Sequence, residues 1–357
     1  MRLVEWVLRR ARSLEPGSFA LVMATGIVSI DVAQAGMGVL ARTLLGINAA
    51  AFGWLLMLSL LRLMRFRGEL LAEFVNPARG AGFLTLVAAT CILGNQCLSV
   101  VSAPGLAHAL AAAGALLWIT LVYLFFAATI TRRVKPGFTR SINGGWLVTV
   151  VATQALATLA IALSAEATPG RTALLFTGLC LYLLGAALYL LIITLVVYRL
   201  VFFPLRALEF TPPYWINMGA LAITTLAGSL FVVSAPASGT LTDLAPFVKG
   251  FSLFFWATAS WWIPLLLVLE IWRHGWRHVP LRYEADDWDI VFPLGMYAVG
   301  TRTLAHALGM DFLLAIPRAG VYVSLLAWVL VALALLRHIV LGGRHTHPLE
   351  AARTDAP

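Results

Sequence analysis

The chain has 357 residues, of which 61% are hydrophobic and only 11% are charged. A soluble domain carries roughly 25% charged residues, so this composition excludes a soluble enzyme, a disordered chain and a disulfide-rich secreted module. It favours an all-α integral membrane protein with several spans. The net charge of +9 would suggest nucleic acid in a soluble protein. In a membrane protein it is more simply explained by basic loops on one side of the bilayer, so no nucleic-acid partner is expected.

Ten segments are long and apolar enough to cross a bilayer, since a spanning helix needs about 20 mostly apolar residues. No long insert separates them, so residues 16–340 are expected to form one transmembrane domain. A cytoplasmic segment, 1–15, precedes this domain, and a cytoplasmic tail, 341–357, follows it. The predicted spans are 16–37, 43–64, 80–101, 106–130, 145–164, 172–199, 213–234, 245–272, 289–309 and 316–340.

Lys and Arg residues lie mainly before the first span and in every second loop, for example Arg132, Arg133 and Lys135 between the fourth and fifth spans. Basic loops stay on the cytoplasmic side, which predicts a plasma or inner membrane protein with both termini in the cytoplasm. Residues 1–35 also have the pattern of a cleavable signal peptide. We expect this segment to be retained, because the first span has the same polar features as the other odd spans.

Odd and even spans differ in composition. The odd spans concentrate Gly, Asn, Gln and Pro, whereas spans 4, 6 and 10 are mostly Leu, Ala, Val and aromatic residues. Polar groups are costly in lipid, which predicts an inner ring of odd spans and an outer, lipid-facing ring of even spans. Each polar residue taken alone could instead form a hydrogen bond between helices.

A threonine near the middle of each odd span recurs at an interval of about two spans. This interval indicates five helical hairpins. The threonines are Thr25, Thr90, Thr153, Thr224 and Thr301, and the first four are candidate pore-lining residues.

The ninth span contains the two basic residues that lie deepest in any span, Arg302 and His306. Hydroxyl and amide donors with one or two basic groups suit an anion, and the spans contain no series of carboxylates as in a proton or cation pump. Arg302 is therefore a candidate for attracting anions; alternatively, it extends to the outer interface or pairs with Asp311. With about 100° per residue, one face of this helix carries Phe292, Met296, Val299, Thr303 and His306.

Four ordered stretches, all on odd spans, resemble the tellurite-resistance/C4-dicarboxylate transporter family, whose superfamily includes the plant slow-type anion channels. They are PGSFALVMATGIVSI (16–30), GGWLVTVVATQALATLA (144–160), PPYWINMGALAITTLAG (212–228) and RYEADDWDIVFPLGMYAVGT (282–301). The resemblance implies ten helices arranged as five hairpins with quasi-fivefold symmetry around a central pore. It also implies that Phe292 closes this pore, and that three copies of the chain associate as a homotrimer with one pore in each.

The resemblance implies transport of small anions, most specifically C4-dicarboxylates such as malate. A sulfite, chloride or nitrate exporter and a tellurite-resistance protein are the alternatives within the class.

No catalytic residue, metal or cofactor is expected. The acidic stretch 284–289 leaves a membrane-embedded transferase as an alternative, but such enzymes need two acidic clusters, and these carboxylates also suit helix capping. A non-conducting scaffold is a further alternative. The sequence does not distinguish a channel from a proton-coupled carrier.

Overall fold

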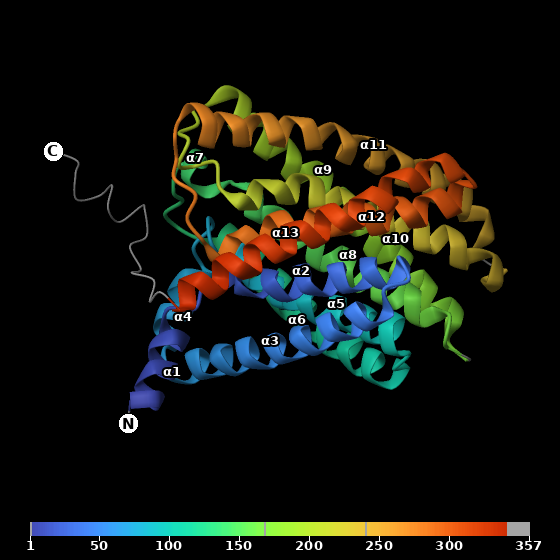
Figure 1. Ribbon diagram of the computed structural model, residues 1–357, viewed down its shortest axis with the longest axis horizontal. Coiled ribbons are helices and arrows are strands. Elements are labelled where there is room, and N and C mark those ends of the chain that lie inside the picture. The colour runs from blue at the N-terminus through green and yellow to red at the C-terminus, as the bar shows by residue number, and fades with distance from the viewer. Residues whose placement is uncertain (1, 168, 240, 341–357) are drawn as a thin grey trace.

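The computed structural model describes residues 2–340 except 168 and 240, and the expected tail 341–357 lies outside this part of the chain. Every regular element in the described residues is helical, and the long helices run side by side as a bundle (Figure 1). Nine of the described helical segments are long and apolar enough to cross a membrane. The predicted class, a helical integral membrane protein, is confirmed.

Ten long helices form five hairpins, in which the two helices of each pair pack against one another. The hairpins are α2 (Ala20–Gln34) with α3 (Gly38–Arg65), α5 (Thr85–Val101) with α6 (Pro104–Thr131), α8 (Val148–Ser164) with α9 (Arg171–Phe202), α10 (Ile216–Ser234) with α11 (Ala245–Glu270), and α12 (Trp288–Leu308) with α13 (Ala315–Val340). Three shorter helices complete the set: α1 (Arg2–Arg12), α4 (Arg67–Phe74) and α7 (Phe138–Ser141).

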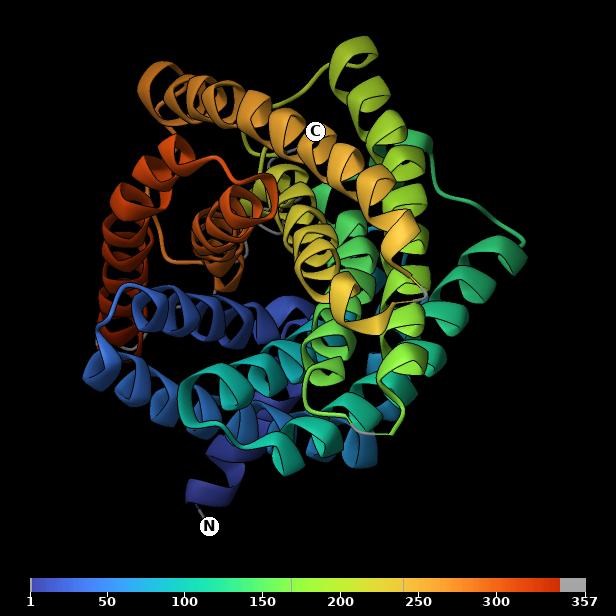
Figure 2. The same cartoon turned by 90° about the vertical axis from the view of Figure 1, so that its right-hand side faces the viewer.

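The first helix of each hairpin belongs to a closed inner ring. In this ring α2 packs against α5, α5 against α8, α8 against α10, α10 against α12, and α12 against α2. Figure 2 looks along the bundle from the end away from α1. In four inner segments 67–94% of the most apolar stretch is buried, whereas the five outer helices are only 11–33% buried over the same length. The predicted division into inner and outer helices agrees with this difference in burial.

Helix α12 corresponds to the ninth predicted span, but it is not among the nine segments that are apolar enough to cross a membrane. Its 21 residues include Asp289 and Arg302, and these charges lower its mean hydropathy. At about 1.5 Å per residue the helix is still about 31 Å long, enough to cross a hydrocarbon core. Because it packs between α10, α2 and α13, most of its surface meets protein and does not have to be apolar.

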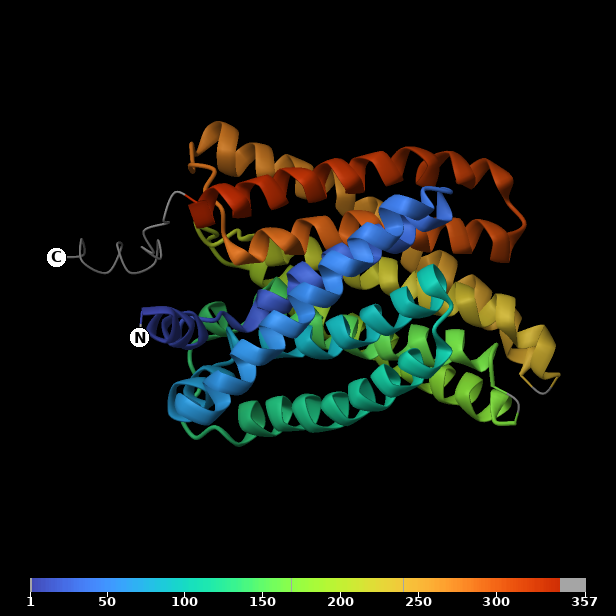
Figure 3. The same ribbon diagram turned by 60° about the horizontal axis from the view of Figure 1, so that its bottom comes forward.

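A 3₁₀ turn precedes each inner helix, and the five turns contact one another in the same cyclic order as the helices. We call the end of the bundle where these turns lie the turn end, and the opposite end the far end; α1 also lies at the turn end (Figures 1 and 3). A Cβ atom at Gly144 would collide with the Pro213 carbonyl oxygen of a neighbouring turn, so backbones meet here. The turns are Pro16–Phe19, Gly80–Leu84, Gly144–Leu147, Pro212–Trp215 and Ala285–Asp287.

This contact predicts that Gly144→Ala destabilises the protein. The added methyl group meets backbone, which cannot rotate away, and overpacking of this kind costs about 1–3 kcal/mol. The control is Gly137→Ala, where no atom lies within 4 Å of the added group. Thermal unfolding in detergent should show a lower Tm for Gly144→Ala and an unchanged Tm for the control. Equal Tm values would contradict the close contact between turns.

Candidate functional site

A cavity of about 140 Å³ lies inside the inner ring, in the half nearer the far end. All five inner helices contribute to its wall, which is mostly apolar with a few amide and hydroxyl groups. The lining residues are Ile27, Ile30 and Gln34 of α2, Ile92, Asn95, Leu98 and Ser99 of α5, Thr158 and Ala162 of α8, Ile223, Leu226 and Leu230 of α10, and Met296, Val299 and Thr303 of α12.

Two close contacts fix the rotation of α12 about its own axis. On one side, a Cβ atom at Gly219 of α10 would lie 2.7 Å from Cγ of Pro293. On the other side, a Cβ atom at Gly295 would lie 3.0 Å from Ile27 of α2. With about 100° per residue, the face that carries Phe292 lies between these two contacts and therefore points into the ring.

The residues on this face run from the turn end toward the far end in the order Phe292, Met296, Val299 and Thr303. The last three line the cavity. Phe292 lies one helical turn, about 6 Å, nearer the turn end than Met296, and its side chain is fully buried. It does not line the cavity. Toward the turn end, the cavity stops at Met296. Phe292 is the next side chain on this face of α12 in that direction.

The threonines predicted to line a pore do not line this cavity. Thr90 and Thr224 donate hydrogen bonds to carbonyl oxygens of their own helices, and none of the four candidate threonines lines the cavity. His306 is exposed near the end of α12 and does not line it either. In three cases a tryptophan of an outer helix donates to a threonine of the next inner helix: Trp328 to Thr25 (3.0 Å), Trp118 to Thr153 (2.9 Å) and Trp256 to Thr301 (2.9 Å).

These three bonds repeat one arrangement around the ring. The donors lie on α13, α6 and α11, and the acceptors lie on α2, α8 and α12, the inner helix of the following hairpin. The hydroxyl oxygens thus face the outer ring and connect one hairpin to the next. A buried hydrogen bond of this kind contributes about 1 kcal/mol, and three of the five threonines in the repeat take part in this packing.

Asn95 is a cavity residue that the sequence did not distinguish from its neighbour Gln96. Its Nδ2 donates to Oγ1 of Thr158 at 3.2 Å, which joins α5 to α8 in the cavity wall. Gln96 points the other way and accepts from Asn48 of α3 at 2.8 Å. The rotation of α5 decides between the two amides, and only the packed ring fixes that rotation.

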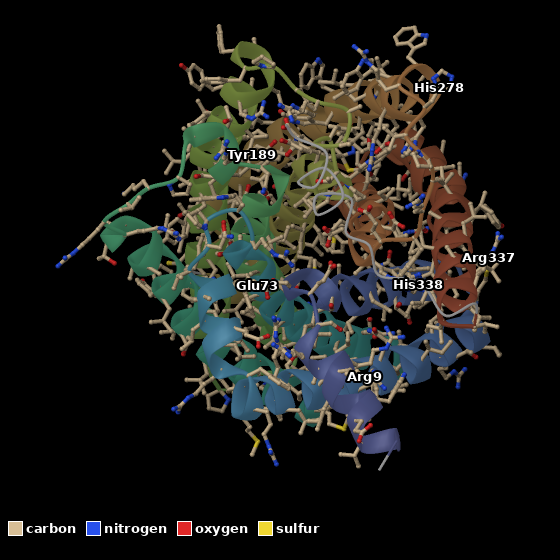
Figure 4. The ribbon with its side chains drawn as sticks, turned by 90° about the vertical axis from the view of Figure 1, so that its left-hand side faces the viewer. Arg9, Glu73, Tyr189, His278, Arg337 and His338 are labelled. Carbon is tan, nitrogen blue, oxygen red and sulfur yellow. The ribbon has the colours of Figure 1, made fainter. Side chains whose placement is uncertain are left out.

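Several basic side chains at the turn end are already paired with acidic groups; one of these acidic groups, Glu73, is labelled in Figure 4, which views this end. Glu73 accepts from Arg62 at 2.7 Å and also pairs with Arg79 at 2.7 Å. Arg199 pairs with Glu209 at 2.9 Å. Arg62 and Arg199 are buried near the ends of outer helices, so these arginines hold the loops in place.

An acidic cluster also lies at the turn end, just before α12. The Asp287 carboxylate accepts the backbone N–H of Glu284 at 3.0 Å, as part of a capping box. Asp286 lies against the first 3₁₀ turn, since a Cβ atom at Gly17 would be 3.1 Å from its Oδ1. Burial, with the nearby charges of Glu15 and Glu284, raises the pKa of Asp286 to about 7. Burial likewise raises the pKa of Asp287 to about 6.

Arg302 is partly buried on α12, and its Nε is shielded from solvent without a hydrogen-bond partner among the described residues. Its sequence position places it about 80° from Phe292, on the side of Gly295 that faces α2. The ion pairs in the described part of the chain do not include one between Arg302 and Asp311. The charge of Arg302 acts instead on Asp31 of α2.

A closed ring of membrane helices around a cavity is the architecture of a channel or transporter. The family model for the voltage-dependent anion channel matches residues 13–336, nearly the whole chain. The chain belongs to this family. Membership supports transport of small anions across a membrane as its general activity, and this family consists of channels and transporters.

Two groups of relatives agree with this assignment. An uncharacterized membrane protein of Mycobacterium tuberculosis is 42% identical over 169 residues, which cover 46% of this chain and 85% of the relative. An uncharacterized transporter of Methanocaldococcus jannaschii is 26% identical over 305 residues, 81% of this chain and 83% of the relative. A second transporter of that organism is 24% identical over 315 residues, 84% of this chain and 87% of the relative.

The raised pKa of Asp286 predicts a pH-dependent stability. The folded protein binds the proton more tightly than the unfolded chain, whose aspartates titrate near pKa ~3.9. The free energy of unfolding therefore falls as the pH rises from about 4 to about 7. Asp286→Asn removes the partly buried charge, so its Tm should exceed that of the wild type by a few degrees at about pH 8 and by less at about pH 5.

The control for this measurement is Asp243→Asn, because Asp243 is exposed. Its Tm should follow that of the wild type at both pH values. A Tm difference between Asp286→Asn and wild type that stays constant between these pH values would contradict the raised pKa.

Proposed function

We propose that the chain moves small anions along the axis of the inner ring, with C4-dicarboxylates such as malate as the first candidates and Phe292 as the gate. The observation that carries the proposal is the position of Phe292. It is fully buried and follows Met296 on the face of α12 that points into the ring, where the cavity ends. A bulky apolar ring in a narrow passage excludes water and offers a desolvated ion no new partners, so it raises a barrier.

The chemistry of the cavity wall supports an anion as the substrate. The lining residues of the described chain include no Asp or Glu, while Asn95, Ser99, Thr158 and Thr303 provide amide and hydroxyl donors. Neutral donors replace the hydration of an anion without holding it tightly. In the closed arrangement these groups donate to helix carbonyls or to each other, for example Thr303 to Val299 at 3.0 Å. They would turn toward the axis when an anion enters.

One observation favours the alternative substrates, namely chloride, nitrate or sulfite. The lining residues in the described part of the chain include no Lys or Arg. Arg302 precedes the lining residue Thr303 on α12 but lies on the side of the helix that faces α2. A dicarboxylate has two charges to balance, whereas a monovalent anion has one. A tellurite-resistance phenotype remains the other alternative, and a panel of anions distinguishes among them.

We also propose that the turn end faces the cytoplasm of a plasma or inner membrane, and that three copies form a homotrimer. The basic helix α1 and Arg132 lie at the turn end, which agrees with the cytoplasmic preference of basic loops. The lipid bilayer and a small anion are then the expected partners of each copy.

The gate predicts that Phe292→Ala increases anion flux by about tenfold or more, because removal of the ring opens a wetted path. Flux of malate, sulfite, chloride and nitrate is measured in proteoliposomes. The control is Phe125→Ala, which deletes an equally buried ring from a separate cluster on α6. The gate assignment fails if Phe292→Ala carries every transported anion at the wild-type rate.

If anions pass through the cavity, a negative charge in its wall should block them. Thr303→Asp should reduce flux at least about tenfold relative to Thr303→Asn, which has the same shape without the charge, since like charges repel strongly at low dielectric. The matched pair is compared at neutral pH in the same proteoliposome assay. Equal flux through both variants would exclude Thr303 from the path.

A further inference from the structure

The buried carboxyl of Asp31 has fewer donors than a charged carboxylate requires. Asp31 lies in the last turn of α2 and is fully buried. Ser324 of α13 donates to its Oδ2 at 2.9 Å. Its Oδ1 is also shielded and receives no hydrogen bond from any described residue. A carboxylate held by one hydroxyl in a protein interior is costly unless an opposite charge lies nearby.

Arg302 supplies that opposite charge, and it is equally short of partners. Its charge acts on the Asp31 carboxyl, but the two side chains are not among the ion pairs of the described residues. The Nε of Arg302 is also shielded from solvent and has no hydrogen-bond partner among the residues that the structure describes. Of the helices packed against α2, α13 contributes the Ser324 hydroxyl, and α3 and α5 contribute no charge to Asp31 in the described part of the chain.

Neither Asp31 nor Arg302 lines the cavity, but each adjoins residues of its own helix that do. Ile30, which precedes Asp31, and Gln34, the last residue of α2, both line the cavity. Thr303, which follows Arg302, lines it from the other helix. An anion in the far half of the cavity therefore comes within reach of a long guanidinium side chain whose Nε forms no hydrogen bond with any described residue.

We infer that Asp31 and Arg302 form a proton-linked anion site. This inference rests on the proposed anion path. When an anion binds the Arg302 guanidinium, the anion offsets part of the positive charge beside Asp31 and so favours the protonated carboxyl. Its Oδ1 then takes one proton from the solution at the far end. The empty site holds one negative and one positive charge; the loaded site holds a neutral carboxyl, a guanidinium and an anion.

The net charge is zero in both states when the anion is monovalent. A site in low dielectric avoids the cost of an unbalanced charge in this way. Proton and anion binding therefore strengthen each other, so anion affinity rises as the pH falls. The consequence for transport is that each monovalent anion is accompanied by one proton.

The test measures proton uptake on anion binding, with no membrane present. Sodium nitrate and disodium malate are added separately to the purified protein in weakly buffered detergent that contains a pH-indicator dye. The wild type should take up about one proton per nitrate bound. Asp31→Asn should bind nitrate without proton uptake, and the exposed Asp311→Asn should match the wild type.

The same titrations give the affinity for nitrate. Arg302→Gln should bind nitrate at least about tenfold more weakly than the wild type, whereas the exposed Arg318→Gln should bind it as tightly as the wild type.

Two results overturn the inference: no anion-dependent proton uptake by the wild type, or the same uptake by Asp31→Asn. Flux in proteoliposomes separates this inference from the proposed function. Nitrate flux without proton uptake refutes the proton-linked site and leaves anion transport intact. Proton uptake on nitrate binding without flux of any anion supports the site and contradicts the proposed function.

Discussion

The close approach of the five inner helices is the constraint on which the rest of the structure depends. Glycines make this approach possible: a Cβ atom at Gly300 of α12 would lie 2.9 Å from the Ala222 carbonyl oxygen of α10, and Gly219 and Gly295 accommodate Pro293 and Ile27 in the same manner. Small residues let membrane helices pack through backbone contacts, in the absence of a hydrophobic driving force between them. The ring therefore closes around a narrow cavity, and Phe292 lies buried on the same face of α12, beyond that cavity.

The outer helices allow the inner ring to be polar. They shield α12 from lipid, so this helix can carry Asp289 and Arg302 inside the membrane. They also hold the hairpins together, since Trp328, Trp118 and Trp256 each donate to a threonine of the next hairpin. The cavity wall is then free of these structural bonds, apart from that between Asn95 and Thr158.

The sequence predicted the features that depend on one helix or on composition. These are the class of helical membrane protein and the inner and outer classes of helix. Of the face predicted for α12, Met296, Val299 and Thr303 line the cavity, whereas His306 does not. Features that depend on the rotation of one helix against another were not predictable. The threonine repeat indicated hairpins, but it could not distinguish a hydroxyl that faces the axis from one that accepts a bond from an outer tryptophan. The position of Asp31 beside Arg302 joins helices far apart in the chain, and no local pattern encodes it.

The central claim is that the axis of the inner ring is the conduit and that Phe292 closes it. Thiol accessibility tests it most directly, in a chain whose Cys91, Cys97 and Cys180 are replaced by serine. We predict that Val299→Cys reacts with a charged, water-soluble thiol reagent from the far end only. With Phe292→Ala added, it should also react from the turn end, while Thr301→Cys, which faces the outer ring, stays unreactive. Reaction from the turn end with Phe292 in place, or equal reaction of Thr301→Cys, would contradict the account.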